Sequence, residues 1–320
     1  VIVDVVFNHV GSPAHPLFID KAYYFRTNAD GGLTNWSGCG NDLRVESAMA
    51  ERMLIEALEH WVRAFNVDGF RFDLAELLGT NFLKKADAYL KKIKPDIVMI
   101  AEPWSFRGHI AGELKTSDYA SWNDGFREFV PAYLGGRSNV EAAKYFIGGS
   151  VGGVANEPWQ SVNYVESHDD RTWIDRITEN HDKNGHHPTL HDRRNTHLMM
   201  SLMTMSLGVP MWSAGMEMLR SKRGVNNTYQ NGDLNALDYE RLREFPATVA
   251  YMRALNRFRI GSHGRALRAK HLSDGYLRFF EVPGSSAVGV LYNAAGNVHA
   301  RRLMYFINPT NTHVKFALEG

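Results

Sequence analysis

The alternation of short apolar runs with amphipathic helical segments constrains the fold more than any other feature of the sequence. Residues 1–7 form a nearly continuous apolar run that is rich in β-branched side chains and is interrupted only by Asp4. Such a run is typical of a strand that is buried on both faces, as in a parallel sheet. Residues 47–66 then show the apolar spacing of an amphipathic helix. Because this order recurs to about residue 260, we predict a parallel sheet with crossover helices.

The expected elements of this first module are strands and helices in alternation. The strands cover residues 1–7, 69–74, 97–101, 121–126, 161–165 and 209–212, and the helices cover residues 47–66, 80–93, 193–207 and 247–259. In the first helix, the expected apolar stripe comprises Met49, Met53, Leu54, Ala57, Leu58, Trp61, Val62 and Phe65. Parallel strands in this number fit either an open doubly wound sheet or part of a (β/α)8 barrel.

The placement of polar residues decides between these two architectures. They gather at the C-terminal ends of several predicted strands, which is where the catalytic groups of a (β/α)8 barrel lie. An open dinucleotide-binding sheet would instead carry a glycine-rich turn after its first strand, and the residues after Phe7 do not form one. We therefore predict an α/β fold in which residues 1–265 form part of a (β/α)8 TIM barrel.

The character of the chain changes near residue 270. Short strand-like runs joined by turns cover residues 276–282, 287–292, 302–307 and 313–317. They predict a second domain over residues 266–320, the start of an all-β C-terminal sandwich. Because residue 1 already lies in a predicted core strand, we also expect the sequence to be a fragment that lacks its N-terminal part.

The composition argues against nucleic acid and membranes as binding partners. The 36 basic and 35 acidic residues leave a formal charge of +1, so nucleic acid is not an expected partner. The single cysteine, Cys39, excludes an internal disulfide framework and a zinc cluster built from cysteines. No apolar run is long enough to cross a bilayer, so we expect no membrane partner. The low cysteine content and the absence of a signal-like start favour the cytoplasm, and the oligomeric state stays open.

Two carboxylates at neighbouring strand ends have contrasting expected surroundings. In residues 69–74, the alternation of side chains places Arg71 and Asp73 on one face, where the arginine favours the ionised form of the aspartate, as a nucleophile requires. Glu102 follows an apolar strand and precedes Trp104, so we expect apolar surroundings that favour its protonated form, as a general acid requires. Such a pair is typical of glycosidases, and their separation distinguishes retention from inversion.

A third carboxylate, Asp169, follows His168 after the strand at 161–165 and is suited to stabilising positive charge on a sugar ring. Each carboxylate also has a structural explanation by itself. The pair of Arg71 and Asp73 fits an ion pair at a barrel mouth, Glu102 fits a position beside a helix cap, and residues 168–170 fit a turn. Their occurrence together at successive strand ends favours catalysis.

Four segments occur in the order and strand context of the four signature regions of the α-amylase superfamily, glycoside hydrolase family thirteen. They are DVVFNH at residues 4–9, GFRFD at 69–73, AEPW at 101–104 and VESHD at 165–169. The chain resembles this superfamily over nearly its whole length, from the third barrel strand into the C-terminal β-domain. The resemblance implies that Asp73 is the nucleophile, Glu102 the general acid/base and Asp169 the transition-state stabiliser.

The same resemblance implies a set of residues that hold the substrate at the point of cleavage. Arg71 positions the nucleophile, Asn8 supports the first loop, and the sugar is held by Asp4, His9 and His168. Aromatic rings near strand ends can stack on sugar faces or serve in packing, and they belong to Trp36, Trp104, Trp122, Trp159 and Trp212. Of these, we expect Trp104 to contact substrate.

Details of the motifs are similar to the debranching group, which includes pullulanase, isoamylase and bacterial glycogen-debranching enzymes. This similarity is carried by the segments at residues 37–42, 73–75, 102–104, 164–169 and 214–222, the last followed by Asn226, Asn227 and Tyr229. It implies hydrolysis of α-1,6 branch linkages in glycogen, limit dextrin or pullulan by double displacement. No cofactor is implied, and no ligand set supports the calcium ion that is common in the superfamily. One departure is Asp170, where these enzymes often carry asparagine or another small polar residue. The aspartate adds like-charge repulsion beside Asp169.

Other functions remain as alternatives. Within the superfamily, an α-1,4-acting amylase or a glucanotransferase would use the same three carboxylates. A non-catalytic glucan-binding barrel protein is the alternative from another class, although all three carboxylate positions are filled. Residues 148–152 match the G-x-S-x-G elbow of serine hydrolases. They follow a predicted helix rather than a strand, which argues against that activity.

Overall fold

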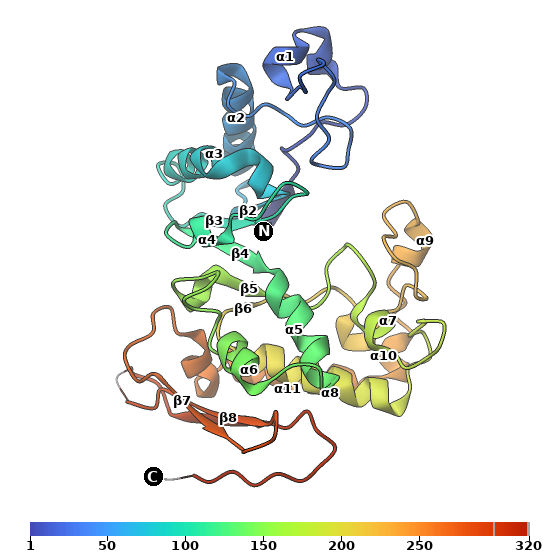
Figure 1. The fold of residues 1–320 in the computed structure, drawn as a ribbon, viewed down its shortest axis with the longest axis vertical. Coiled ribbons are helices and arrows are strands. Elements are labelled where there is room, and N and C mark those ends of the chain that lie inside the picture. The colour runs from blue at the N-terminus through green and yellow to red at the C-terminus, as the bar shows by residue number, and fades with distance from the viewer. Residues whose placement is uncertain (297, 319–320) are drawn as a thin grey trace. The chain divides into compact units, whose positions relative to one another are not determined.

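The computed structural model describes residues 1–296 and 298–318. It divides into two compact units, which are shown as a ribbon in Figure 1. The first unit comprises Val1–Trp122 and Gly152–Asn156, and the second comprises Asn123–Val151 and Glu157–Gly320. None of the helices in the described ranges combines the length and apolar character that crossing a membrane requires.

The first unit alternates strands and helices, as the sequence predicts. Its elements are β1 (Ile2–Val5), η1 (His15–Phe18), α1 (Lys21–Tyr24), α2 (Ala48–Phe65), β2 (Gly69–Phe72), α3 (Ala75–Leu90), β3 (Val98–Ala101), α4 (Ala111–Leu114) and β4 (Tyr119–Asn123), whose last residue begins the second unit. The strands pair in chain order, and every pair is parallel. The α/β fold with a parallel sheet is therefore confirmed.

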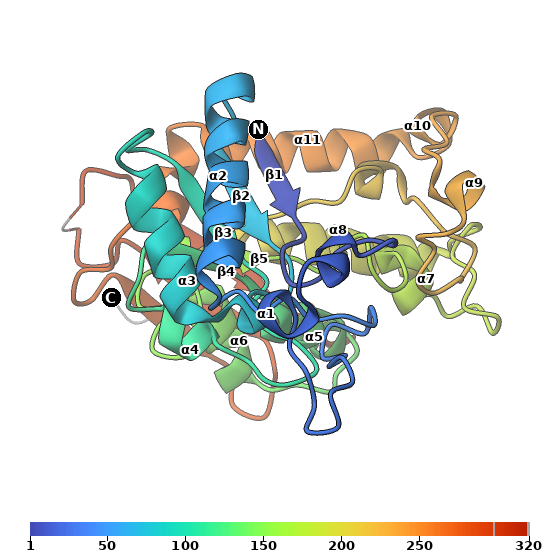
Figure 2. The same cartoon turned by 90° about the horizontal axis from the view of Figure 1, so that it is seen from above.

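Helices α2 and α3 are the crossovers between consecutive strands, and they pack against each other (Figure 2). In α2 the buried side chains are Ala50, Leu54, Leu58 and Val62, at a spacing of four residues. The predicted stripe was too wide, because Met49, Met53 and Phe65 on its flanks are exposed. The core of this unit lies between the helices and the sheet and includes Phe70, Phe72 and Leu83.

The edge strand β1 and its inner neighbour β2 differ in burial. All four residues of β2 are buried, as expected for a strand inside a parallel sheet. Strand β1 pairs only with β2 among the described strands, and of its residues only Val5 is buried. Burial of this run on both faces, which the sequence predicted, is therefore wrong for the described residues, because one edge of the strand has no neighbour.

The second unit contains the remaining elements. They are α5 (Asp124–Leu134), α6 (Val140–Ile147), η2 (Pro158–Gln160), β5 (Ser161–Asn163), α7 (Trp173–Ile177), α8 (Leu190–Met205), β6 (Val209–Pro210), η3 (Met216–Met218), α9 (Gly232–Asn235), α10 (Arg241–Glu244), α11 (Pro246–Ile260), η4 (His263–Arg268), β7 (Leu277–Glu281), β8 (Val288–Tyr292) and β9 (Leu303–Ile307). Strands β5 and β6 are parallel. The G-x-S-x-G match follows helix α6, and its Ser150 is fully buried.

The antiparallel sheet β7–β8–β9 shares a core with helix α8 in this unit. The Ser201 hydroxyl of α8 donates to the Tyr305 hydroxyl of β9 at 3.1 Å. The predicted strand at residues 313–317 is wrong, since these residues pair with no strand, and the Phe316 ring contacts the Phe306 ring instead. The boundary predicted between residues 265 and 266 stays a prediction.

Gly69 at the start of β2 provides a test of the sheet packing. A Cβ atom at this position would lie 2.1 Å from the carbonyl oxygen of Val98 on β3. We expect Gly69→Ala to lower the free energy of unfolding by roughly 2 to 4 kcal/mol, because strand pairing must distort to accept the methyl group. Urea unfolding measures the change. Gly112→Ala is the control, since no atom outside the backbone of its own helix lies within 4 Å of its added Cβ. Equal effects of the two substitutions would contradict this packing.

Candidate active site

Arg71, near the end of β2, is the centre of the candidate site in the first unit. Its side chain is 5% exposed. The Nη1 atom donates to Asp4 Oδ1 at 2.7 Å and to Asp73 Oδ1 at 2.8 Å. The Nη2 atom lies 3.0 Å from Glu102 Oε2 as an ion pair. Burial by itself would lower the pKa of Arg71, but the three carboxylates outweigh burial and raise it.

The parallel register explains why these side chains meet. Asp4 lies opposite Arg71, and Phe72 lies opposite Ala101. Successive side chains of a strand alternate between faces, so Asp73 and Glu102, just beyond the strands, continue on the face that carries Arg71. On the same face, the Trp122 ring of β4 lies under the guanidinium, with 4.1 Å from Cζ to the ring centroid. Such a cation–π contact stabilises the buried charge further.

Asn8 is a second partner of Asp73. Its side-chain amide Nδ2 donates to Asp73 Oδ2 at 2.8 Å and to the Asp73 carbonyl oxygen at 2.9 Å. Its Oδ1 atom lies 2.6 Å from His9 Nδ1, which orients that ring. Both oxygens of the Asp73 carboxylate are therefore held, one by a cation and one by an amide. This arrangement holds the carboxylate in a fixed orientation.

Glu102 is buried, as the sequence predicts, with 4% exposure. Its surroundings differ from the prediction, because Oε2 accepts the backbone N–H of Leu74 at 2.8 Å and faces the Arg71 guanidinium. The prediction of apolar surroundings is therefore wrong, and the parallel register that brings β2 beside β3 is the reason. The protonated form that a general acid requires stays a prediction.

The loop after Glu102 is folded back on itself. Trp104 and His109 form an antiparallel bridge, and their rings stack with centroids 6.2 Å apart. The Arg107 Nε atom donates to Glu76 Oε1 at 3.0 Å, and the Ser105 hydroxyl also donates to Glu76. The loop that carries Trp104 is thus attached to α3, the helix that follows the nucleophile candidate. Contact between Trp104 and a sugar stays a prediction.

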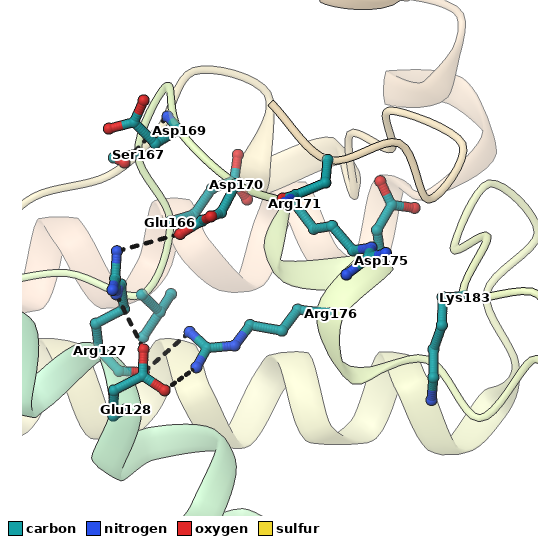
Figure 3. Close-up of a pocket in the computed structure, with 12 residues that line it drawn as sticks. Arg127, Glu128, Glu166, Ser167, Asp169, Asp170, Arg171, Asp175, Arg176 and Lys183 are labelled. Atoms are coloured by element: carbon teal, nitrogen blue, oxygen red, sulfur yellow. Dashed lines mark hydrogen bonds and ion pairs between the residues drawn. The ribbon is translucent and has the colours of Figure 1, made fainter. Parts of the chain in front are cut away.

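In the second unit, the loop after β5 carries His168 and Asp169. Both side chains are exposed, and His168 Nε2 lies 3.6 Å from Asp169 Oδ2. The Asp169 backbone N–H donates to Ser167 Oγ at 3.2 Å, and Figure 3 shows Asp169 beside Ser167 in the bend of the loop. The site that this pair is predicted to form with Asp73 and Glu102 stays a prediction.

A cavity of about 280 Å³ adjoins this loop, and charged side chains of both signs line it (Figure 3). Asp170 accounts for one of these charges. Its carboxylate lies 3.4 Å from Arg127 Nη1, and its backbone N–H donates to Asn227 Oδ1 at 2.8 Å. Its φ angle is 57°, a left-handed conformation that aspartate tolerates. The extra carboxylate beside Asp169 is therefore balanced by a cation, which offsets the like-charge repulsion expected from the sequence.

Glu166 lies beneath the same loop and is 3% exposed. Its Oε2 atom accepts the backbone N–H of Trp173 at 2.6 Å, whereas Oε1 has no hydrogen-bond partner among the described residues. Burial raises the pKa of Glu166 to about 7, although the Trp173 N–H and the cations Arg220 and Lys222 act in the opposite direction.

Sequence reasoning missed several of these supporting residues. It named Trp122 only as a ring for stacking or packing and missed its contact with Arg71. It also missed Arg127 beside Asp170 and the buried group of Glu166, Asp175 and Lys222. For Asp175 a signal was present, since Thr172 followed by Asp175 is a helix-start pattern, and the Thr172 side chain does cap α7. The others are brought to the site by tertiary contacts alone. Within the described residues, no group of three or more His, Cys, Asp and Glu side chains is arranged to hold a metal ion.

No protein-family model matches the chain. The pullulanase of Bacillus subtilis strain 168 is 32% identical over 286 residues, which cover 80% of this chain and 39% of that protein. The glycogen debranching enzyme of Cronobacter sakazakii is 32% identical over an alignment of 334 residues, which covers 89% of this chain and 50% of that protein. The solved structure of pullulanase from Bacillus acidopullulyticus matches with a TM-score of 0.87 and 29% identity, covering 97% of this chain and 41% of that one.

These matches define the class of protein. Over most of its length the chain is similar to pullulanases and glycogen debranching enzymes, which confirms the resemblance to the debranching group seen in its motifs. Pullulanase and glycogen debranching enzyme are the names of the relatives reported above, and isoamylase is the name of a relative from Oryza sativa. The chain spans half or less of the length of these relatives.

The buried carboxyl group of Glu166 predicts a pH-dependent stability. Its pKa is about 7 in the folded protein, against an ordinary value of 4.5. Folding therefore favours the protonated form, and the stability that this gives is present at low pH and lost as the pH rises from about 4.5 to about 7. Glu166→Gln removes the titrating group and keeps an acceptor for the Trp173 N–H. We therefore expect the free energy of unfolding of Glu166→Gln, minus that of the wild type, to increase by about 3 kcal/mol between pH 4 and pH 8.

Urea unfolding of both proteins at several pH values measures this difference. The control is Glu179→Gln, because Glu179 lies on the surface of the same unit. A difference between wild type and Glu166→Gln that does not change with pH would show that Glu166 titrates normally.

Proposed function

We propose that this protein hydrolyses α-1,6 branch linkages of a branched α-glucan, such as glycogen, limit dextrin or pullulan, with retention of configuration. The observation that carries the proposal is the single guanidinium of Arg71, which holds Asp73 and also contacts Glu102. The support from homology comes from relatives named for debranching activities. Those names favour debranching over an α-1,4 amylase, a glucanotransferase or a non-catalytic barrel protein.

The proposed reaction is a double displacement. Asp73 attacks the anomeric carbon while Glu102 protonates the departing glycosidic oxygen, which forms a covalent glycosyl-enzyme and releases the first product. Glu102, now ionised, removes a proton from water, and the water oxygen replaces Asp73 at the anomeric carbon. Arg71 and Asn8 hold the Asp73 carboxylate in position for the attack, and Asp169 stabilises the positive charge on the sugar ring. Asp4, His9 and His168 hold that sugar, and Trp104 contacts it.

The same proposal concerns the fold of the whole protein. The parallel strands of the two units belong to a (β/α)8 barrel, and β7–β9 begin a C-terminal β-domain. The support is the structural match to pullulanases over 97% of the chain. The mechanism uses no cofactor, and the predictions of no resident cofactor and of a cytoplasmic location stay predictions.

The role of Glu102 can be tested with pullulan as the substrate. We expect Glu102→Gln to lower kcat by about 10²- to 10⁴-fold, because the amide can neither donate the proton nor activate water. Reducing-end release measures the rate, and the sizes of the products identify the linkage that is cleaved. Glu113→Gln is a matched control on the surface of the same unit. Unchanged activity of Glu102→Gln would refute the proposed mechanism.

The stereochemical course tests the nucleophile independently. Because two successive displacements at one carbon restore its configuration, the first sugar released carries the α configuration at its new reducing end. Proton NMR during the first minutes of the reaction distinguishes the two anomers before they interconvert. A β-anomer as first product would exclude Asp73 as a covalent nucleophile and would require an inverting mechanism.

A further inference from the structure

Lys222 is a buried lysine that the proposed mechanism does not use. It follows η3 in the second unit and is 1% exposed. Its Nζ atom donates to the backbone carbonyl oxygen of His168 at 3.1 Å. A buried ammonium group is costly unless it is paired or hydrogen-bonded. Its hydrogen bond to the backbone next to Asp169 therefore indicates a role in holding this loop.

The surroundings of this ammonium group are rich in charge. Burial and the nearby Arg220 lower the pKa of Lys222, while the carboxylates of Glu166, Asp169 and Asp175 act in the opposite direction. An ionised lysine donates a stronger hydrogen bond to a carbonyl than a neutral donor does. The Nζ atom thus contacts the backbone of His168 within the electrostatic influence of three acidic groups.

Asp175 on helix α7 fixes the backbone from which Lys222 extends. Its buried carboxylate accepts the backbone N–H of Lys222 at 2.7 Å and the hydroxyl of Ser221 at 2.6 Å. It also accepts the hydroxyl of Thr172 at 2.7 Å and the backbone N–H of Gly185 at 2.8 Å. Because both carboxylate oxygens of Asp175 accept hydrogen bonds, the backbone of Lys222 is held in a fixed position.

Two further contacts attach the same loop to the same segment. Arg171 Nε donates to the carbonyl oxygen of Gly224 at 2.8 Å, and the backbone N–H of Asp170 donates to Asn227 Oδ1 at 2.8 Å. The backbone N–H of Asn227 also donates to the carbonyl oxygen of Asp170 at 3.4 Å, so four hydrogen bonds join residues 222–227 to residues 168–171. Of these four contacts, only that of Lys222 is made by a side chain that is almost fully buried and ionisable.

We propose that Lys222 is a positioning residue, which holds the His168 backbone so that the neighbouring Asp169 carboxylate is presented at a fixed place. The proposal rests on the proposed function, in which Asp169 stabilises charge that develops on the sugar ring. A group that acts mainly in the transition state affects kcat more than substrate binding. Loss of Lys222 therefore lowers kcat and the affinity for cationic transition-state mimics, while KM and the affinity for neutral sugars change little.

The kinetic experiment compares Lys222→Met with the wild type on pullulan. Methionine keeps most of the side-chain length and removes the charge and the donor. We expect kcat to fall about 10- to 100-fold with KM within about twofold, since a small displacement of a catalytic group has an effect of this size. A cationic iminosugar should lose affinity by a similar factor, and maltotriose should not. Lys270→Met, at an exposed lysine of the same unit, is the control.

A second measurement does not depend on activity. Amide hydrogen exchange of peptides that cover residues 166–171 should become faster in Lys222→Met and stay unchanged in Lys270→Met. Lys222→Arg, which keeps a charged donor, should recover most of the lost kcat and protection. If Lys222→Met does not fold, as circular dichroism would show, Lys222→Gln replaces it with the same expectations.

The outcomes separate the two proposals. An unchanged kcat, or a kcat loss with unchanged exchange at residues 166–171, overturns the role of Lys222. If the wild type cleaves no α-glucan, the proposed function fails, and the exchange result alone decides whether Lys222 holds the loop.

Discussion

The candidate site of the first unit depends on one buried guanidinium. The carboxylates of Asp4, Asp73 and Glu102 meet near the ends of neighbouring strands, where they would repel one another without a cation. Arg71 contacts all three from beneath, two through Nη1 and one through Nη2. A planar guanidinium can do this because its donors point in fixed, divergent directions, whereas an ammonium group acts as a point charge.

The backbone that follows Asp73 also helps to hold Glu102 beside Arg71. Leu74, directly after the nucleophile candidate, has a φ angle of 39°, in the left-handed region that non-glycine residues seldom adopt. In this conformation its N–H donates to Glu102, and the next residue, Ala75, donates its N–H to the carbonyl oxygen of Glu102. Glu102, which follows the adjacent strand β3, thus accepts the backbone N–H groups at the start of helix α3. Strain at such a place is typical of functional sites, and the surrounding hydrogen bonds maintain it.

Sequence patterns predicted the local features of this site well. The alternation in β2 places Arg71 and Asp73 together, and the 2.8 Å contact confirms it. Sequence patterns failed where a neighbouring strand determines the surroundings of a side chain. The residues that flank Glu102 in sequence are apolar, but its carboxylate faces Arg71 of the adjacent strand. They failed in the same way for residues 313–317, which have the composition of a strand but pair with none. Local sequence contains no information about which segment lies alongside.

The second unit shows the same limit for buried polar residues. Glu166, Asp175 and Lys222 are distant in sequence and carry no shared pattern, yet they gather beneath the loop of His168 and Asp169. By itself the sequence determined the α/β class, the order of strands and helices, and the motifs that identify the debranching group, because these depend on short-range periodicity and on residue identity. Only the tertiary structure decided which charges face one another and which are buried, because the pKa of a carboxylate and the support of a loop depend on groups that the fold brings together through space.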